Sequence, residues 1–158
     1  MSAFYINFIL FYIIFQNCVC EKYIVVNEPV SWFQALINCK NAGMELASVN
    51  SEEESKALDK FLKDNGYTYG YWLAGTNLGD GSYYWATTGR KVIYTNWLSG
   101  QPDNAKTEYN KREGENCIQL GMPTYSPKPN GWNDYGCKGT LPYICQKDEL
   151  CYSDENII

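Results

Sequence analysis

The sequence SWFQALINCKNAGMELASVNSEEESKALDKFLKDNG, residues 31–66, decides the fold class, because it encodes two helices in direct succession. Ser31 and Ser51 are each followed three residues later by a Gln or Glu whose side chain can reach back, which is the spacing of a capping box at a helix start. Apolar residues then recur at helical spacing in each segment. We therefore predict two amphipathic helices, the first ending at Gly43 and the second at Gly66.

Strand-like runs follow the helices. From Tyr67 onward Tyr, Trp, Thr and Gly dominate, and helical periodicity gives way to five short runs: YGYWLAG (69–75), YYWATT (83–88), VIYTNW (92–97), NCIQLG (116–121) and LPYICQK (141–147). Residues 21–26 predict another strand before the first helix. The order of strand, two helices and then strands with long loops predicts an α+β fold rather than an alternating α/β fold.

Composition and charge restrict the possible partners and chemistry. A chain of 158 residues is long enough for one domain with its own core and too short for two ordinary ones. Lys and Arg number 13 against 18 Asp and Glu, a net charge of -5, which argues against nucleic acid or an acidic membrane as partner. The absence of histidine removes His-activated nucleophiles and His-ligated zinc, but it leaves carboxylate chemistry and calcium bound by oxygen ligands.

Residues 1–20 are typical of a secretory signal peptide. An apolar run over residues 4–15 precedes small residues, so we expect cleavage after Cys20 and a secreted, extracellular protein. A membrane anchor is the alternative, but the run is shorter than the roughly 20 apolar residues of a spanning helix, and Asn7 interrupts it. We expect no membrane insertion, and the remaining chain divides into a domain at residues 21–147 and a polar tail at residues 148–158.

The cysteines of a secreted chain are expected in disulfides, because the compartment is oxidising. Five follow the expected cleavage site, enough for two bridges with one left over: Cys39, Cys117, Cys137, Cys145 and Cys151. The first four allow three pairings, and their spacing does not choose among them. We expect the leftover Cys151 to link two copies in a homodimer or to be a capped thiol, although cleavage after Cys18 would leave Cys20 able to pair with it.

Side chains whose oxygen atoms can bind a metal gather in the second half of the chain. They are Gln101, Asp103, Glu115, Asn133 and Asp134. A bridge between Cys117 and Cys137 would bring Glu115 close to the last two. Three carboxylates and two amides, without a nitrogen or sulfur ligand, suit calcium and do not suit zinc or copper. The alternative is a polar surface turn without a metal.

From Tyr23 to about Lys147 the sequence resembles a C-type lectin domain. An ordered set of residues and motifs carries the resemblance: Cys39, Tyr71-Trp72-Leu73-Ala74-Gly75, Trp97, Gln101-Pro102-Asp103, Glu115-Asn116-Cys117, Trp132-Asn133-Asp134, Cys137 and Tyr143-Ile144-Cys145. The resemblance implies a C-type lectin-like fold with two helices, antiparallel sheets and long calcium-binding loops. It also implies the bridges Cys39–Cys145 and Cys117–Cys137 and a cis Gln101–Pro102 peptide bond.

The resemblance implies a calcium-dependent carbohydrate-binding function. In this family the calcium ion binds two vicinal hydroxyls of a sugar, and the metal ligands also form hydrogen bonds with those hydroxyls. The implied ligands, which also contact the sugar, are Gln101, Asp103, Glu115, Asn133 and Asp134. The order Gln-Pro-Asp goes with galactose-type sugars by this resemblance, so glycans with such sugars are the expected partners.

The sequence departs from the family pattern in two parts of this region. Ala105 stands about where galactose-selective members place a Trp, so Tyr109 is the candidate for the sugar contact, and the loop also carries Lys106, Lys111 and Arg112. An auxiliary calcium site is expected to be empty or weak, because three of the four residues near it are amides: Asn77, Asp80, Asn104 and Asn116.

Two other classes of function are alternatives to calcium-dependent sugar binding. A C-type lectin-like domain can bind a protein or another non-sugar partner, with calcium structural or absent, and the basic loop and missing Trp favour that alternative. An enzyme is the third class, since Asp103 and Glu115 imitate the acid pair of a glycosidase. A calcium-bound carboxylate is a poor general acid, because the cation favours its ionised form, so we expect no catalysis.

Overall fold

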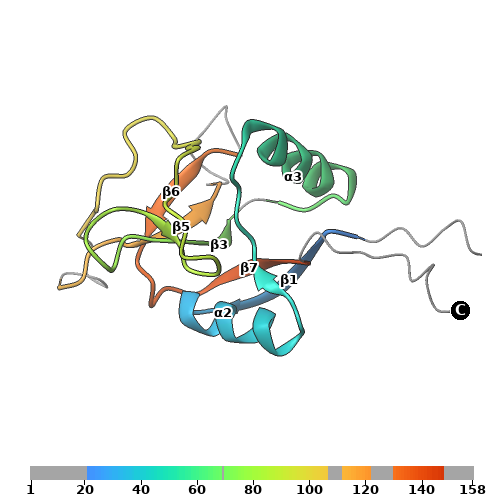
Figure 1. Ribbon diagram of the computed structural model, residues 1–158, viewed down its shortest axis with the longest axis horizontal. Coiled ribbons are helices and arrows are strands. Elements are labelled where there is room, and N and C mark those ends of the chain that lie inside the picture. Colours follow the sequence, from blue (N-terminus) through green and yellow to red (C-terminus); the bar gives the residue numbers. More distant parts are fainter. Residues whose placement is uncertain (1–20, 69, 107–111, 122–129, 148–158) are drawn as a thin grey trace, which may run out of the picture.

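The computed structural model of the protein describes residues 21–68, 70–106, 112–121 and 130–147. Figure 1 shows helices α2 and α3 on either side of the strands. The elements of this part of the chain follow one another in the order β1 (Tyr23–Val30), α2 (Trp32–Asn41), β2 (Glu45–Leu46), α3 (Glu52–Asp64), β3 (Tyr71–Thr76), β4 (Tyr84–Trp85), β5 (Cys117–Leu120), β6 (Trp132–Tyr135) and β7 (Leu141–Gln146). The predicted α+β class is confirmed.

Serine caps begin both helices as predicted. Ser31 Oγ accepts a hydrogen bond from the backbone N–H of Gln34 at 3.3 Å, and Ser51 Oγ accepts one from that of Glu54 at 3.2 Å. The return contact predicted for Gln34 is wrong, because its amide donates instead to Asn38 one turn further on. Both helices end as predicted, with the glycines at residues 43 and 66 in the left-handed conformation at φ 68° and 69°.

The strands form one mixed sheet in the order β1-β7-β3-β5-β6, with β2 paired to β7 and β4 to β3. Most neighbouring strands pair antiparallel as expected, whereas β3 and β7 are parallel neighbours, with Trp72 opposite Tyr143. A parallel pair needs a long connection, and residues 77–140 supply it. Strands β5 and β6 are antiparallel within that connection, and their register places Gln119 opposite Asn133.

Residues 92–97 do not form the predicted strand. The segment forms isolated backbone contacts instead of a continuous strand ladder. The Val92 N–H donates to the Tyr83 carbonyl, and Trp97 forms an isolated bridge with Trp132. Trp132 opens β6, which we did not predict, because the polar residues that follow it do not resemble a buried strand. Its ring packs edge-on against those of Trp85, Tyr94 and Trp97, with centroids 5.6–5.8 Å apart.

Among the described residues, one disulfide joins the two ends of the domain and a second lies within the long connection. Cys39 on α2 is bonded to Cys145 on β7, and Cys117 on β5 is bonded to Cys137 just after β6, with Cα–Cα distances of 5.5 and 5.3 Å. Both pairings implied by the resemblance are confirmed. The predicted leader, tail and Cys151 lie outside the described residues, so these expectations stay predictions.

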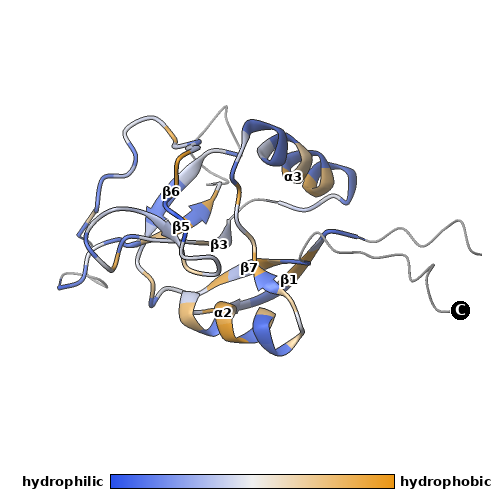
Figure 2. Ribbon diagram, viewed as in Figure 1, coloured by the Kyte–Doolittle hydropathy of each residue, from blue (hydrophilic) through white to orange (hydrophobic). Residues whose placement is uncertain are grey.

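The hydropathy of the residues differs between two elements, α2 and β7, and the long connection. Figure 2 shows hydrophobic colouring on these two elements, whereas most of the long connection after β3 is hydrophilic or neutral. Among the described residues, no helix has the length and apolar character needed to cross a membrane. The hydrophilic connection is therefore the part of the fold richest in polar residues that could form a site.

Candidate functional site

The loop after Trp97 brings Gln101 and Asp103 to the end of strand β6. Its start is fixed by backbone hydrogen bonds to Trp132, which accepts from Leu98 N–H at 2.8 Å and donates to the Asn96 carbonyl at 2.7 Å. The Gln101–Pro102 peptide bond is cis, as the resemblance implied. The Gln-Pro-Asp tripeptide is distant from β6 in sequence, and these hydrogen bonds hold the start of its loop beside that strand.

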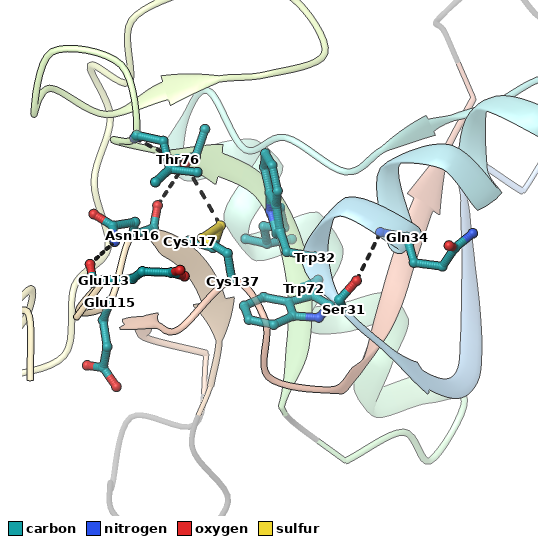
Figure 3. Close-up of a disulfide and its surroundings, with 12 residues drawn as sticks. Ser31, Trp32, Gln34, Trp72, Thr76, Glu113, Glu115, Asn116, Cys117 and Cys137 are labelled. Carbon is teal, nitrogen blue, oxygen red and sulfur yellow. Dashed lines mark hydrogen bonds between the residues drawn. A yellow bond between two sulfur atoms is a disulfide. The ribbon is translucent and has the colours of Figure 1, made fainter. Parts of the chain in front are cut away.

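The other predicted site residues come from the start of β5 and from β6. Glu115 precedes β5 by two residues, and Asn116 N–H donates to the Tyr135 carbonyl at 3.3 Å, which holds the two chain segments together. Figure 3 shows Glu115 and Asn116 next to the Cys117–Cys137 disulfide. The disulfide therefore lies beside the site, as the spacing of cysteines and oxygen ligands suggested.

Three carboxylates converge at this place. Asp103, Glu115 and Asp134 each offer one carboxylate oxygen, and these three atoms all lie within 4.8 Å of one another. Glu115 is 5% exposed and Asp134 is 1% exposed, whereas Asp103 is exposed. We call these three side chains the acidic cluster.

The acidic cluster is electrostatically unfavourable without a cation. Burial is the largest of the causes that raise the pKa of Glu115 from 4.5 to about 7, and the negative charges of Asp134 and Asp103 contribute to the same rise. Burial also raises the pKa of Asp134, although backbone N–H groups of Asn104 and Asp103 oppose that rise. A site in which like charges are held together and partly dehydrated fits a bound cation that neutralises them.

Backbone donors fix the carboxylate of Asp134. Its Oδ1 accepts from Asp103 N–H at 3.1 Å and its Oδ2 accepts from Asn104 N–H at 2.8 Å. Because Asp134 is on a strand of the sheet, these two hydrogen bonds hold the Gln-Pro-Asp loop at a fixed distance from the core. Asp103 Oδ1 in turn accepts from Ala105 N–H at 3.1 Å, which restrains the exposed carboxylate.

Asn104 links the two ends of the site loop. It has a positive φ of 49°, and its Oδ1 accepts a hydrogen bond from Glu115 N–H at 2.8 Å. Gly114 makes this contact possible, because a Cβ at that residue would meet Asn104 Oδ1 at 2.0 Å and its φ is 67°. Asn104 was predicted near an auxiliary metal site, and its role as a link across the loop was not predicted.

Asp80 and Asn116, which also lie near the expected auxiliary site, have partners of their own, whereas Asn77 Oδ1 is buried without a hydrogen-bond partner among the described residues. Asp80 accepts hydrogen bonds from Ser82 N–H at 2.9 Å and from the Tyr84 hydroxyl at 3.1 Å, and Asn116 Nδ2 donates to the Glu113 carbonyl at 2.6 Å. That the auxiliary site is empty or weak stays a prediction.

The two predicted amide ligands differ in burial and in partners. Gln101 is half-buried, and its Oε1 accepts from Asp103 N–H at 3.1 Å. Asn133 is buried, and its Nδ2 donates to Gln119 Oε1 at 3.3 Å and to the Asp134 carbonyl. Gln119 was missed by the sequence reading, because its contact with Asn133 depends on the register of β5 and β6.

The aromatic side chain of Tyr83 is close enough to the acidic cluster to be affected by its charge. The rings of Tyr83 and Trp97 are 5.0 Å apart, and burial together with the charges of Asp134 and Glu115 raises the pKa of the Tyr83 hydroxyl.

Lys106 and Arg112 are exposed, as expected for a basic loop. The predicted sugar contact Tyr109 lies outside the described residues, as does Lys111.

Comparisons with known proteins concern the sequence and the fold as a whole. The sequence pattern of the family described as "Lectin C-type domain" matches residues 28–147. The chain is 30% identical over 132 residues to "Salivary C-type lectin 2" of Aedes albopictus, covering 80% of this chain and 83% of that protein. Its fold is similar to the cow C-type carbohydrate-recognition domain of CD23, crystallised in the presence of an oligosaccharide, with a TM-score of 0.64, 27% identity and coverage of 83% and 92%.

A second solved structure of similar fold has a different kind of name. It is the herring type II antifreeze protein, with a TM-score of 0.62, 26% identity and coverage of 79% of this chain and 88% of that one. Likeness of fold and sequence at this level therefore includes proteins whose names do not refer to sugars.

Proposed function

Because the chain belongs to the C-type lectin domain family, we propose that it is a secreted protein that binds carbohydrate through a calcium ion. The observation that carries the proposal is the acidic cluster, in which three carboxylate oxygens lie within 4.8 Å of one another and two of the side chains are buried. Like charges in this position cost free energy unless a cation joins them.

The proposed calcium ligands are the five residues named from the sequence: Gln101, Asp103, Glu115, Asn133 and Asp134. They supply only carboxylate and amide oxygens, which are the ligands that calcium prefers. Their combined charge of three negatives exceeds that of the ion, so the site attracts a divalent cation strongly over a monovalent one. A calcium ion bound here would supply coordination positions for two hydroxyls of a sugar.

The protein's own residues would orient the sugar. Asp103 is the exposed member of the acidic cluster, and its carboxylate can accept a hydrogen bond from a hydroxyl. Gln101 stands on the other side of Pro102 and can donate from its amide. An acid after the proline and an amide before it is the arrangement that goes with galactose-type sugars in the family, and we propose that preference here.

We propose that one copy of the protein binds a single sugar weakly and that several linked copies bind a glycan with higher avidity. One shallow site gives modest affinity, whereas linked sites raise it greatly. An interchain disulfide at Cys151 would provide a pair of sites. The proposed extracellular location follows from the predicted signal peptide and is supported by the relative named a salivary lectin.

A second candidate function is binding of a protein or another non-sugar partner, with calcium structural or absent. It is favoured by the exposed Lys106 and Arg112 on the site loop, by Ala105 in place of a stacking Trp, and by the similarity of fold to an antifreeze protein. We propose no catalytic activity, because the carboxylates that resemble an acid pair are assigned to the metal.

The experiment is affinity chromatography of the secreted protein on galactose and mannose resins in calcium, followed by elution with a chelator. We expect retention on galactose, release by chelator and weaker retention on mannose. Asp103→Ala should abolish both retention and calcium binding, while the control Glu113→Ala, an exposed acid in the same loop, should retain both. Equal retention on both resins would refute the galactose preference, and retention indifferent to chelator would favour the non-sugar candidate.

A further inference from the structure

Strand β1 lies at an edge of the sheet, and its first half lacks the features that usually protect such an edge. The main row of described strands runs β1-β7-β3-β5-β6, so β1 is at one end of the row. Edge strands are commonly protected from pairing with another chain by a bulge, a charge or a proline. The second half of β1 has all three, namely a register shift after Val26 and the exposed residues Glu28 and Pro29. Residues 24–26 carry neither charge nor proline, so this segment of the edge can accept another strand.

Val25 directs its main-chain N–H and C=O groups away from β7. Its partner in the register of β1 and β7 is Ile144, whose carbonyl accepts from Ala47 N–H at 2.8 Å on the other side of β7. Hydrogen-bonded and non-hydrogen-bonded pairs alternate along an antiparallel ladder. The Lys22 carbonyl, three residues before Val25, accepts from Lys147 N–H at 2.9 Å. Val25 therefore belongs to a non-hydrogen-bonded pair, and its donor and acceptor point outward from the edge.

Apolar side chains accompany these outward groups. Ile24 is 40% exposed, and Val26, on the same face of the strand, is half-buried. This is the face of the sheet that carries α2, because Ile24 is opposite Cys145, which is bonded to Cys39 of α2. A strand paired with β1 would cover Ile24 and would satisfy the main-chain groups of Val25.

The end of the domain places a tether beside the same edge. Because Lys147 is hydrogen-bonded to Lys22, the chain leaves the described domain next to the start of β1. Cys151 follows four residues later, outside the described residues. The two disulfides of the domain use its other four cysteines. A second copy of this chain would bring a second Cys151 to the edge, which makes a second copy the best-matched occupant.

We propose that β1 is the interface between two copies of the chain, which pair antiparallel about Val25 and are joined by a disulfide between their Cys151 side chains. The two Val25 residues would exchange both N–H···O=C bonds, and Ile24 would be opposite Val26 of the second copy. The two thiols lose two electrons and two protons, which a disulfide of the oxidising secretory compartment takes up through thiol–disulfide exchange.

The reach of the chain ends is sufficient for this linkage. With a rise of about 3.4 Å per residue and a strand spacing of about 4.8 Å, the two Lys147 Cα atoms of such a pair would be roughly 25 Å apart. Two extended segments of four residues, together with the Cα–Cα distance of a disulfide, span up to roughly 32 Å. The bridge can therefore form without separating the paired edges.

The pairing determines where the two candidate sites lie. Asp134 of the acidic cluster is on β6, at the other end of the row from β1. In a continuous sheet of two copies the two β6 strands are the outermost, roughly 40 Å apart at about 4.8 Å per strand. The two acidic clusters would thus lie at opposite ends of the pair, an arrangement that suits bridging of two separate glycans. This last step rests on the proposed lectin function, whereas the interface does not.

The first test is the oligomeric state of the full secreted chain, measured by light scattering and on non-reducing gels. We expect a covalent dimer for the wild type and a monomer for Cys151→Ser at micromolar concentration, because a contact between two short strands is small and weak by itself. A monomeric wild type would leave the edge to a strand of a different protein and would overturn the proposal.

The second test is hydrogen exchange of the β1 amides by NMR. The Val25 amide should exchange about tenfold or more slowly in the wild-type dimer than in monomeric Cys151→Ser, because one hydrogen bond is gained there. The amides of Ile24 and Val26 belong to the pairs bonded to β7, so they should be protected in both proteins and serve as the internal control. A disulfide-linked dimer in which Val25 exchanges as it does in the monomer would overturn the edge interface.

The third test separates the edge from the helix surface. Val25→Pro removes an N–H that β7 does not use, so β1 should still pair within its own copy while the contact with a second copy is lost. We expect the covalent dimer fraction to fall by about threefold or more, since the edges no longer bring the tails together. The control Ile37→Lys changes a 51% exposed apolar residue of α2 and should leave this fraction unchanged. A larger loss in Ile37→Lys than in Val25→Pro would place the interface on α2 and refute the proposal.

The fourth test concerns the arrangement of the sites. In calcium the wild type should agglutinate galactose-coated beads, whereas Cys151→Ser should still be retained on a galactose resin without agglutinating the beads. A dimer that is retained on the resin but fails to agglutinate would contradict the outward arrangement. Failure of the wild type to bind either galactose or mannose would refute the proposed function, while the gel and exchange tests would still decide the interface.

Discussion

Glu115→Gln should have opposite effects on stability with and without calcium. Glu115 is buried in the acidic cluster beside two other carboxylates, and Gln has nearly the same shape without the charge. In chelator the substitution removes repulsion and should stabilise the fold. In calcium it removes a charged ligand and should weaken the stabilisation that the ion provides.

The pKa of Glu115 gives the magnitude of the first effect. This pKa is raised from 4.5 to about 7 in the folded protein. One pKa unit corresponds to about 1.4 kcal/mol, so the shift corresponds to about 3 kcal/mol in the free energy of unfolding. The folded state binds the extra proton between these two pH values, so the free energy of unfolding in chelator falls as pH rises from about 4.5 to about 7. Above pH 7 the folded protein carries the full free-energy cost of the ionised Glu115 carboxylate, and below pH 4.5 this cost is absent.

The assay is urea unfolding of wild type and Glu115→Gln in chelator and in saturating calcium. At pH 8 in chelator the variant should be more stable by up to about 3 kcal/mol, and most of that gain should disappear at pH 5. In calcium at 100 times the Kd the wild type should gain about 2.7 kcal/mol, and the variant should gain much less.

The exposed Glu113 is the matched control for this prediction. Glu113 lies in the same loop and pairs with Lys138 on the surface, so Glu113→Gln should change little in either condition. A variant Glu115→Gln that is less stable than wild type in chelator at pH 8 would refute the description of the acidic cluster as a repulsive, cation-requiring site.

Three further substitutions test the scaffold around the site. Gly75→Ala places a Cβ 2.2 Å from the Ile118 side chain between β3 and β5, so the free energy of unfolding should fall by about 1–3 kcal/mol, and an unchanged urea midpoint would contradict the packing. Gly114→Ala should displace Asn104 and weaken calcium binding more than it lowers the melting temperature; calorimetry showing a wild-type Kd would disprove that link. Ser51→Ala should cost about 1 kcal/mol through loss of the α3 cap without altering calcium affinity, and a changed Kd would show coupling that the structure does not predict.

Local features of the sequence predicted the helices well. The serine at each start and the glycine at each end act within a few residues, so their effects do not depend on the rest of the fold. The same locality limited the prediction of the strands. Residues 92–97 have the composition of a strand but contribute an isolated bridge at Trp97 instead, while β6 forms from a polar segment because β5 and Trp97 lie beside it.

The convergence of the three acids of the candidate site was predicted, whereas the residues that support them were not. The resemblance assigned the acidic and amide ligands, and the structure brings the three acids together. Asn104 and Gln119 were not found as supports, because one acts across the loop and the other across a strand pair. Such contacts depend on register and turn geometry, which the order of residues alone does not determine. The parallel pairing of β3 and β7 was missed for the same reason.

The pairing of β1 with β7 has a practical consequence for attachment of the domain. Tyr23 is opposite Gln146, and Lys147 N–H donates to the Lys22 carbonyl at 2.9 Å, so the chain enters and leaves the domain at one corner. In Figure 1 this corner is at the opposite end of the molecule from the long connection that carries the acidic cluster. A sensor chip, a fluorescent fusion or a multimerising scaffold joined at this corner of the domain would therefore leave the acidic cluster pointing outward.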